Sequence, residues 1–325
     1  MPKAIRIHET GGPEVMRWEE VALPAPGPGE VRLRHTAVGL NFIDVYHRTG
    51  LYPLPLPAGL GQEGAGVVEA VGAGVDFLRA GDRVAYCGAG APGAYAEVRN
   101  APAERMVPLP AGIDDRTAAA MMLKGLTAWY LLRRTYAVLP GDTILVHAAA
   151  GGVGLILCQW AAHLGATVIG TVGSRAKAEL AAAHGCQHAL VLGEDDFVAK
   201  ARALSGGQGL PVVYDSVGKD TFMASLDCLR PRGLMVSFGQ SSGPVPPLEM
   251  TLLSAKGSLY LTRPSLFAYV AERSELLAAA AELFGLVVAG VLRIEVHQTY
   301  PLQDAARAHR DLEGRRTTGS TVLIP

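Results

Sequence analysis

DTILVHAAAGGVGLILCQWAAHLGATVIGTVG, residues Asp142–Gly173, is the stretch of the sequence that decides the fold. Its apolar run Ile144–Val146 predicts a buried parallel strand. The turn Ala149–Gly154 is a variant of the G-x-G-x-x-G pattern with alanine in first place. A helix pattern over Val153–Leu164 and a second strand over Thr167–Val172 follow. Strand, glycine turn, helix and strand in this order predict a dinucleotide-binding unit.

The glycines of this turn have separate physical roles. Gly151 lets the backbone approach a pyrophosphate, and Gly154 lets the helix pack closely on the strand. The helix N-terminus then offers free N–H groups and the positive end of its dipole to the phosphates.

The residues after the second strand indicate which dinucleotide binds. An NAD site usually places Asp or Glu there to hold the ribose 2′-hydroxyl. Here Gly173 stands at that point, followed by Ser174, Arg175 and Lys177. One alternative is that the two cations are solvated residues of the next helix. Cations at a helix N-terminus oppose the dipole, however, and a 2′-phosphate gives them a reason to be there. The pattern therefore favours NADPH.

Composition and charge limit the remaining classes of function. The chain has 325 residues, of which 49% are hydrophobic and 18% are charged, enough for two domains with cores of their own. The net charge of −1 gives no global field to recruit nucleic acid or an acidic membrane. The first residues lead into a strand pattern, and no apolar run is long enough to span a membrane. We expect a soluble, cytoplasmic protein.

The four cysteines Cys87, Cys158, Cys186 and Cys228 are widely scattered. Without a C-x-x-C pair they form neither a zinc motif nor a disulfide framework. We expect reduced thiols.

The first part of the chain, up to about residue 125, has a different rhythm from the centre. Short strand patterns separated by Gly and Pro predict a compact irregular β-domain. They cover Ala4–His8, Glu30–Val38, Gly64–Val71, Arg83–Tyr86 and Ala94–Val98. A helix pattern over Arg116–Tyr136 leads out of it.

The central part predicts a doubly wound α/β fold with a parallel six-stranded sheet. Its strand patterns cover Ile144–His147, Thr167–Val172, His188–Leu192, Pro211–Ser216, Gly233–Phe238 and Gly257–Thr262. Helix patterns lie between most of them: Val153–Leu164, Arg175–His184, Phe197–Leu204 and Phe222–Leu229. The last part predicts a helix over Glu272–Val288, a strand over Leu292–Gln298, a helix over Asp304–Glu313 and a strand over Gly319–Ile324. We interpret this part as a return to the first domain, which makes the cofactor domain an insertion.

Several motifs along the whole chain resemble one known family. They are His8–Val15, Gly39–Asp44, Arg48–Pro53, Gly61–Gly66, Gly81–Val84 and Ala148–Gln159. On these residues the chain resembles the zeta-crystallin-like NADPH:quinone oxidoreductases, a zinc-independent branch of the medium-chain dehydrogenase/reductase superfamily.

The resemblance implies an architecture and a cofactor. A GroES-like, distorted β-barrel catalytic domain is expected over residues 1–125 and 264–325. A Rossmann domain that binds NADPH is expected as an insertion over residues 126–263. The family also implies a homodimer. The apolar segment Met250–Thr262 predicts a strand at the sheet edge, where exposed backbone groups invite pairing with a second copy.

The resemblance also indicates whether the site is expected to bind zinc. The zinc-dependent branch needs a Cys-His-Cys site, but Asn41 and Gln62 stand here in place of the first cysteine and the histidine. An amide is a poor substitute for thiolate or imidazole on zinc, so we expect no metal. Asp44 and Glu63 are then expected to be polar supports and not ligands.

A quinone is an acceptor that suits such a site, because it is electrophilic and spreads the charge of an added hydride over its ring. The protein then mainly needs to dock a flat substrate and exclude water. The resemblance points to Asn41, Tyr46 and Tyr52 as catalytic candidates. Asn41 would orient the nicotinamide ribose or the substrate oxygen. The tyrosines would stack on the quinone and donate a hydrogen bond, or only shape the pocket.

The cofactor contacts that we expect are Asn41, Thr127, Gly151, Gly152, Val153, Gly173, Ser174, Arg175, Lys177, Ser216, Phe238, Gly239, Ser241 and Arg315. Those outside the glycine turn and residues 173–177 rest mainly on the resemblance. Arg315, next to Arg316, is equally compatible with surface charge.

Two alternatives to quinone reduction stay open. The same site would add hydride to an activated C=C bond in an enone or enal. A non-enzymatic NADPH-binding protein with a structural or RNA-binding role is the other alternative, but the near-neutral charge without a basic stripe argues against nucleic acid.

Overall fold

The computed structural model describes all 325 residues. The chain forms two compact units. Unit 1 contains Met1–Leu126, Val270–Gly290 and Ile294–Pro325, and unit 2 contains Thr127–Tyr269 and Val291–Arg293. None of the helices combines the length and the apolar character that crossing a membrane requires.

Unit 2 is built on a six-stranded sheet, and the predicted doubly wound fold is confirmed. The strand order is β11-β10-β9-β12-β13-β14, and every pair is parallel. The strands are β9 (Thr143–His147), β10 (Thr167–Val172), β11 (His188–Val191), β12 (Leu210–Asp215), β13 (Leu229–Ser237) and β14 (Tyr260–Thr262). In chain order this is 3-2-1-4-5-6, the arrangement of dinucleotide-binding sheets.

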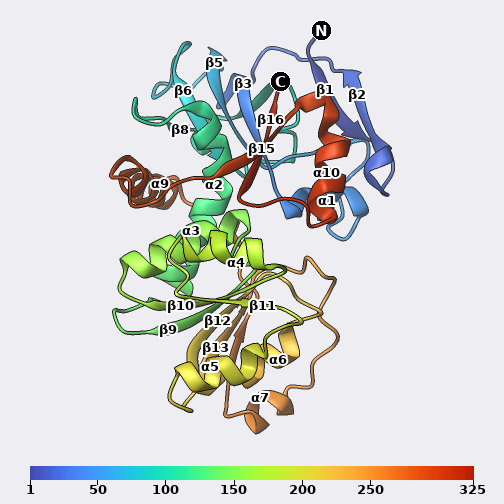
Figure 1. The fold of residues 1–325 in the computed structure, drawn as a ribbon. Coiled ribbons are helices and arrows are strands. Elements are labelled where there is room, and N and C mark those ends of the chain that lie inside the picture. The colour runs from blue at the N-terminus through green and yellow to red at the C-terminus, as the bar shows by residue number, and fades with distance from the viewer. The chain divides into compact units, whose positions relative to one another are not determined.

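Helices cover both faces of this sheet, as Figure 1 shows. One face carries α3 (Gly152–His163) and α4 (Arg175–Ala182), and the other carries α5 (Phe197–Leu204) and α6 (Phe222–Asp227). On the second face one row of side chains, Ile169, Leu145, Val213 and Met235, crosses four paired strands. Each of them is fully buried, which explains why these strands appear in the sequence as continuous apolar runs.

The chain enters unit 2 through α2 (Asp115–Tyr130), which continues as a π-helical turn, Leu131–Thr135. The predicted single helix over Arg116–Tyr136 is therefore wrong at its end. The Leu131 carbonyl accepts the wide hydrogen bond of this turn from Tyr136 N at 3.3 Å, and the Tyr214 hydroxyl on β12 also donates to it at 3.0 Å. A tertiary hydrogen bond thus supports an irregularity that local sequence does not reveal.

Unit 1 is mostly antiparallel β-structure. One sheet has the order β2-β1-β4, with β1 (Lys3–Ile7), β2 (Met16–Glu20) and β4 (Ala58–Gly59). The other has the order β15-β16-β3-β5-β6-β8, and β7 also pairs with β3. Its strands are β3 (Glu30–Leu40), β5 (Glu63–Val71), β6 (Arg83–Cys87), β7 (Val98–Pro102), β8 (Val107–Pro108), β15 (Val296–Pro301) and β16 (Ser320–Ile324).

Besides the first part of α2, unit 1 contains the helices α1 (Phe42–Thr49), α9 (Arg273–Val288) and α10 (Ala305–Glu313). The C-terminal strand β16 pairs with β3, so the last part of the chain belongs to the same sheet as the first. The core of this unit combines Ile5, Leu33 and Tyr86 from the N-terminal part with Leu302 and Leu323 from the C-terminal part.

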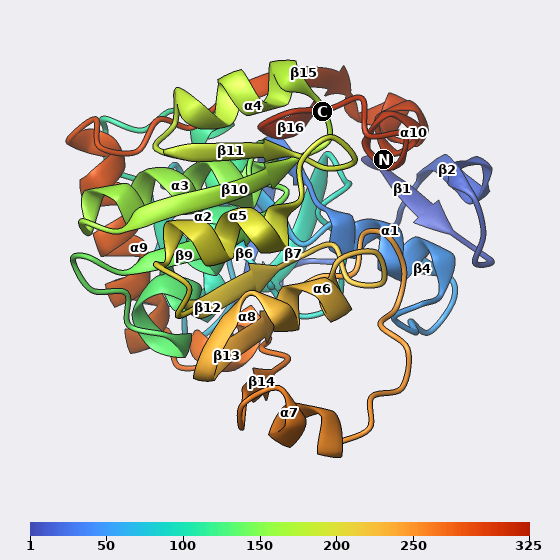
Figure 2. The same cartoon turned by 60° about the horizontal axis from the view of Figure 1, so that its bottom comes forward.

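Several local predictions were wrong. The strand predicted over Ala94–Val98 lies at Val98–Pro102, because residues 94–97 pair with β1 through one isolated bridge only. The strand predicted over Leu292–Gln298 lies at Val296–Pro301. The apolar segment Met250–Thr262 is not one strand. It forms α7 (Thr251–Ala255) and then β14, which Figure 2 shows at the sheet edge beyond β13. The helices α1, α7 and α8 (Leu266–Tyr269) were not predicted.

Candidate functional site

The glycine turn between β9 and α3 has the geometry of a phosphate cradle. Ala148 has a φ of +54°, and Gly151 N donates to Ala148 O at 2.9 Å, which turns the chain sharply into the helix. A Cβ on Gly154 would lie 2.3 Å from Ala148 O, so only glycine fits there. No side chain caps α3. Its first N–H groups, at Gly152 and Val153, are therefore suited to the oxygens of a pyrophosphate.

At the end of β10 the structure brings the predicted phosphate-binding residues together. The Ser174 hydroxyl accepts a hydrogen bond from Lys177 N at 3.4 Å and caps α4. Gly173 is exposed, and nothing lies within 4 Å of the Cβ that a side chain would add, which leaves room for a ligand. Ser174 and Arg175 are exposed as well.

Sequence reasoning missed a carboxylate at this place. Glu194, in the loop after β11, accepts a hydrogen bond from Arg175 Nε at 3.0 Å. The strand β11 pairs with β10, so its loop arrives beside the Ser174 turn. The side chains of both partners are mostly exposed, at 83% for Arg175 and 51% for Glu194, so water weakens this ion pair and a phosphate can compete for the arginine.

The carboxyl ends of β12 and β13 are tied to each other. Phe238 N donates to Asp215 O at 2.8 Å, and Ser241 N donates to Ser216 O at 3.1 Å. A Cβ on Gly239 would lie 2.6 Å from Ser216 O, so glycine allows the two loops to touch. The predicted residues thus form one group at the carboxyl ends of the strands, where ligands of such folds bind. They are Ser216, Phe238, Gly239 and Ser241.

In unit 1 the predicted residue Asn41 belongs to a buried polar cluster with Glu63 and Lys124. The Glu63 Oε1 atom accepts hydrogen bonds from Asn41 Nδ2 at 2.8 Å and from Lys124 Nζ at 2.6 Å. Its other oxygen accepts from Leu123 N at 2.6 Å. The Glu63 side chain is 0% exposed and that of Lys124 is 7% exposed. Sequence reasoning missed Lys124, although a lysine within the apolar run MMLKGL was a signal for it.

Asn41 also begins α1, and the helix is held from its other side by a second polar chain. Asn41 N donates to Asp44 Oδ2 at 2.9 Å, and the Tyr95 hydroxyl donates to the same oxygen at 2.9 Å. Tyr95 lies 3.1 Å from His309 Nε2, and His309 Nδ1 lies 3.2 Å from an Arg48 nitrogen. The Arg48 nitrogen can only donate, so His309 Nδ1 accepts from it. His309 therefore carries its proton on Nε2 and donates it to the Tyr95 hydroxyl oxygen.

This chain ends on an ion pair that joins α1 to α10. The Arg48 guanidinium donates to both oxygens of Glu313, at 2.9 and 2.7 Å. Burial lowers the pKa of His309 to about 3, and the neighbouring Arg48 adds to that shift, so the histidine is neutral. The network fixes α1, the helix that carries Tyr46.

The two predicted tyrosines lie side by side. The rings of Tyr46 and Tyr52 have centroids 5.1 Å apart and meet edge to face at 63°. Tyr52 N donates to Tyr46 O at 3.0 Å, which folds the chain after α1 back on the helix. Tyr46 is buried and Tyr52 is half-buried. Tyr46 lies in the middle of α1, five residues after Asn41, and Tyr52 follows the C-terminal end of the helix.

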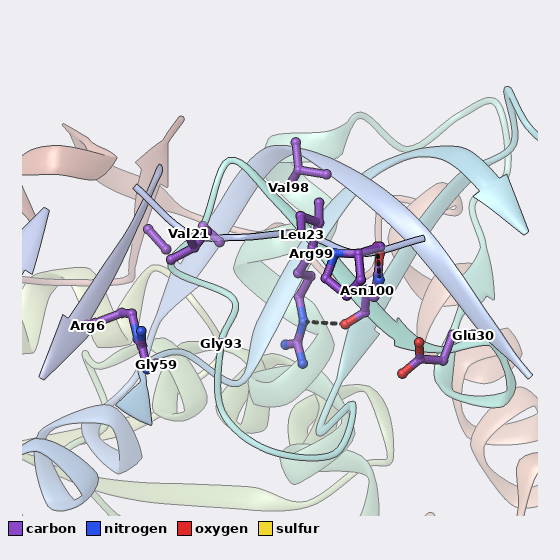
Figure 3. Close-up of a pocket in the computed structure, with 12 residues that line it drawn as sticks. Arg6, Val21, Leu23, Glu30, Gly59, Gly93, Val98, Arg99 and Asn100 are labelled. Atoms are coloured by element: carbon purple, nitrogen blue, oxygen red, sulfur yellow. Dashed lines mark hydrogen bonds between the residues drawn. The ribbon is translucent and has the colours of Figure 1, made fainter. Parts of the chain in front are cut away.

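Two further predicted contacts lie outside these groups. Thr127 is buried within α2, and Arg315 is exposed in the turn after α10, where it has a φ of +57°. A cavity of about 360 Å³ in unit 1 is lined by none of the predicted residues. Figure 3 shows it around Arg99 and Asn100, and Arg99 Nε donates to the Asn100 carbonyl at 3.4 Å.

The donor set at Asn41 does not suit zinc. The position holds two amides, Asn41 and Gln62, and the nearby carboxylate of Glu63 already accepts an ammonium and an amide on one oxygen. Zinc requires thiolate, imidazole or a free carboxylate. The Lys124 ammonium, 2.6 Å from the Glu63 carboxylate, would also repel a zinc ion bound there.

Comparison with known proteins agrees with this fold. Residues 27–111 match the alcohol dehydrogenase GroES-like domain and residues 152–283 match the zinc-binding dehydrogenase family. Together these define a medium-chain dehydrogenase/reductase, and they confirm the predicted GroES-like domain.

Relatives that match along the whole chain identify the family within this superfamily. A quinone oxidoreductase of Pseudomonas aeruginosa is 55% identical, with 100% of each chain covered. The crystal structure of Escherichia coli quinone oxidoreductase complexed with NADPH is 51% identical, with a TM-score of 0.97 and coverage of 99% of this chain and 100% of that one. A 2-haloacrylate reductase of Burkholderia sp is 49% identical, with 100% of this chain and 99% of that one covered. The chain therefore belongs to the zinc-independent quinone oxidoreductase family.

The network around α1 yields a prediction about pH. Burial raises the pKa of Asp44 from its ordinary value of 3.8 to about 7, and Glu63 adds to the shift. The hydrogen bonds from Asn41 and Tyr95 and the charge of Lys124 oppose it. The folded chain therefore keeps this proton to higher pH than the unfolded chain. The stability that Asp44 contributes is fully present below about pH 4 and is lost as the pH rises toward 7.

We predict that the difference in free energy of unfolding, wild type minus Asp44→Asn, falls by up to about 1 kcal/mol per pH unit between pH 4.5 and 7. Urea titrations at a series of pH values measure it. The buried histidines are present in both proteins, so their titration cancels in the difference. A difference that stays flat or rises with pH would show that Asp44 is ionised throughout.

Proposed function

We propose that this chain transfers a hydride from NADPH to a quinone without a metal ion. The observation that carries the proposal is its 51% identity, over 99% of the chain, to a quinone oxidoreductase whose structure contains NADPH. Bound NADPH supplies the hydride, and the residues of this chain bind and orient the reactants.

We assign NADPH binding to the inserted domain, residues 126–263. Gly151, Gly152 and Val153 would hold the pyrophosphate through the uncapped N–H groups of α3. Gly173, Ser174, Arg175 and Lys177 would hold the 2′-phosphate by charge and hydrogen bonds. The remaining contacts we propose are Thr127, Ser216, Phe238, Gly239, Ser241 and Arg315.

The other domain, residues 1–125 and 264–325, supplies the catalytic residues in this proposal. Tyr46 and Tyr52 present aromatic surface against which a flat quinone can stack. Each of their hydroxyl groups can donate a hydrogen bond to the acceptor. Asn41 orients the nicotinamide ribose or the acceptor. A quinone spreads the added charge over its ring, which reduces what the protein must stabilise.

A second substrate class has direct support. A 2-haloacrylate reductase is 49% identical over the full chain, and its substrate is an activated C=C bond next to a carboxylate. Reduction of conjugated carbonyl compounds is therefore the alternative function, and it uses the same cofactor site.

We further propose that the partner in solution is a second copy of this chain, through the edge of the unit 2 sheet. The edge strand β14 carries Tyr260 and Leu261, which are 61% and 38% exposed, and Met250 nearby is 73% exposed. Unpaired backbone groups and apolar side chains on an edge strand favour pairing with another strand.

The reducing environment of the cytoplasm is the compartment we propose. All four cysteines are free thiols and buried. A chain of this size without disulfides fits that compartment.

The test of the function is a panel of acceptors with NADPH and NADH side by side. We expect NADPH oxidation with 1,4-benzoquinone and 1,4-naphthoquinone, and slower oxidation with 2-chloroacrylate and simple enones, followed by absorbance at the wavelength of the reduced nicotinamide. Faster turnover of the acrylate than of every quinone would favour the alternative function. No oxidation with any acceptor would refute both.

The cofactor preference tests the residues after β10. Arg175→Ala and Lys177→Ala should each raise the Michaelis constant for NADPH by roughly tenfold or more, because each removes a charged hydrogen bond to the 2′-phosphate. The constant for NADH should change little. Lys200→Ala, an exposed lysine on α5, is the matched control. Equal effects on both nucleotides would mean that these cations do not touch the extra phosphate.

The sheet edge can be tested by light scattering at micromolar concentration. We expect a dimer for the wild type and a monomer for Leu261→Glu, since a buried charge at the interface is costly. Leu204→Glu is the matched control, because Leu204 on α5 is also 38% exposed. A wild-type monomer, or the same loss of dimer in both variants, would contradict the proposal.

A further inference from the structure

Lys124 is a buried cation that none of the roles described so far uses. It lies on α2 among fully buried side chains, including Met121, Met122 and Leu126. Placing an ammonium there is unfavourable unless it is paired, and its partner is the buried carboxylate of Glu63 at 2.6 Å. Replacing such a pair by apolar residues is often neutral or stabilising, so stability alone is a weak reason for it.

Glu63 also determines what Asn41 can do. The ionised carboxylate only accepts hydrogen bonds, so the Asn41 side chain must turn its amide nitrogen toward Glu63 Oε1, where the distance is 2.8 Å. The amide oxygen faces the backbone N–H of Asp44 in the capping box of α1 and keeps a second lone pair for a ligand. Asn41 is therefore suited to accept from a hydroxyl or amide of the cofactor, and poorly suited to donate to the oxygen of an electron acceptor.

Lys124 has the donors that Asn41 lacks. An ammonium has three N–H bonds, and one of them is directed at Glu63 Oε1, the same atom that binds Asn41 Nδ2. The remaining N–H bonds lie beside the Asn41 side chain because both nitrogens share this acceptor atom. A fixed positive charge thus stands beside Asn41, which replaces one of the zinc ligands of the zinc-dependent branch.

We propose that the Lys124 ammonium is the electrophilic group of the reaction, and that it stabilises the negative charge that develops on the acceptor oxygen. The inference rests on the proposed function. The acceptor gains the hydride with its electron pair from NADPH, which becomes NADP⁺, and an electron pair of the acceptor moves onto its oxygen. Lys124 donates a hydrogen bond to that oxygen and keeps its proton. Water then supplies the proton that completes the reduced product.

In this role Lys124 stabilises different acceptors to different extents. A quinone delocalises the charge over its ring, so a fixed cation helps it modestly. In a 2-haloacrylate the charge stays on one carboxylate group, which an ammonium binds and stabilises strongly. Loss of Lys124 should therefore change the ratio of the two activities, which a merely structural role would not do.

The experiment compares wild type with Lys124→Met and with the double variant Glu63→Gln, Lys124→Met. The double variant removes both charges, so it stays folded where the single variant leaves an unpaired carboxylate. Melting temperature and the NADPH dissociation constant, from quenching of protein fluorescence, report folding and cofactor binding. Steady-state kcat and KM are measured with 1,4-benzoquinone and with 2-chloroacrylate. Lys200→Met is the control for loss of a lysine.

We expect NADPH affinity of the double variant within about twofold of wild type. Its kcat/KM should fall roughly tenfold with benzoquinone and on the order of a hundredfold with 2-chloroacrylate, as expected for loss of one charged hydrogen bond. Recovery of wild-type kcat/KM on both acceptors would overturn the inference, since Lys124 would then only neutralise Glu63. An equal loss on both acceptors would also overturn it. A wild type that reduces neither acceptor would refute the proposed function itself and this inference with it.

Discussion

The carboxylate of Glu63 is the constraint on which the site in unit 1 depends. It is fully buried, and an ionised carboxylate in such a place must find donors for its oxygens. Lys124, Asn41 and the Leu123 N–H supply them, and so β5, the start of α1 and α2 are held at one point. Gly39 makes this possible, because a Cβ there would lie 2.2 Å from Glu63 Oε1.

In unit 2 the polar groups of the candidate site that suit a phosphate are exposed or half-buried. The turn before α3 leaves backbone N–H groups without a capping side chain, and the loop after β10 leaves Ser174 and Arg175 exposed. These groups are wholly or partly exposed to solvent, whereas the donors around Glu63 each already make a hydrogen bond to its buried carboxylate. A charged nucleotide suits the first arrangement, and an acceptor that gains negative charge during its reduction suits the second.

How much the sequence predicts depends on how local the cause is. The turn at Gly151–Gly154 and the strands beside it follow from short-range rules, and Thr167–Val172 and Phe197–Leu204 have the predicted bounds. Contacts between distant residues were not predicted. Lys124 meets Glu63 across 61 residues, and Glu194 meets Arg175 only because β11 pairs with β10. The apolar segment Met250–Thr262 misled because a short apolar run fits a helix as well as a strand.

The most direct test of the account concerns the charge at Glu63. An ammonium and an amide satisfy this carboxylate, and we expect the reaction to need no Lewis acid. Steady-state oxidation of NADPH by 1,4-benzoquinone, measured after dialysis against a strong chelator and again after zinc is added back, decides this. The account predicts the same rate in both samples. A rate that falls after dialysis and returns with zinc would contradict it.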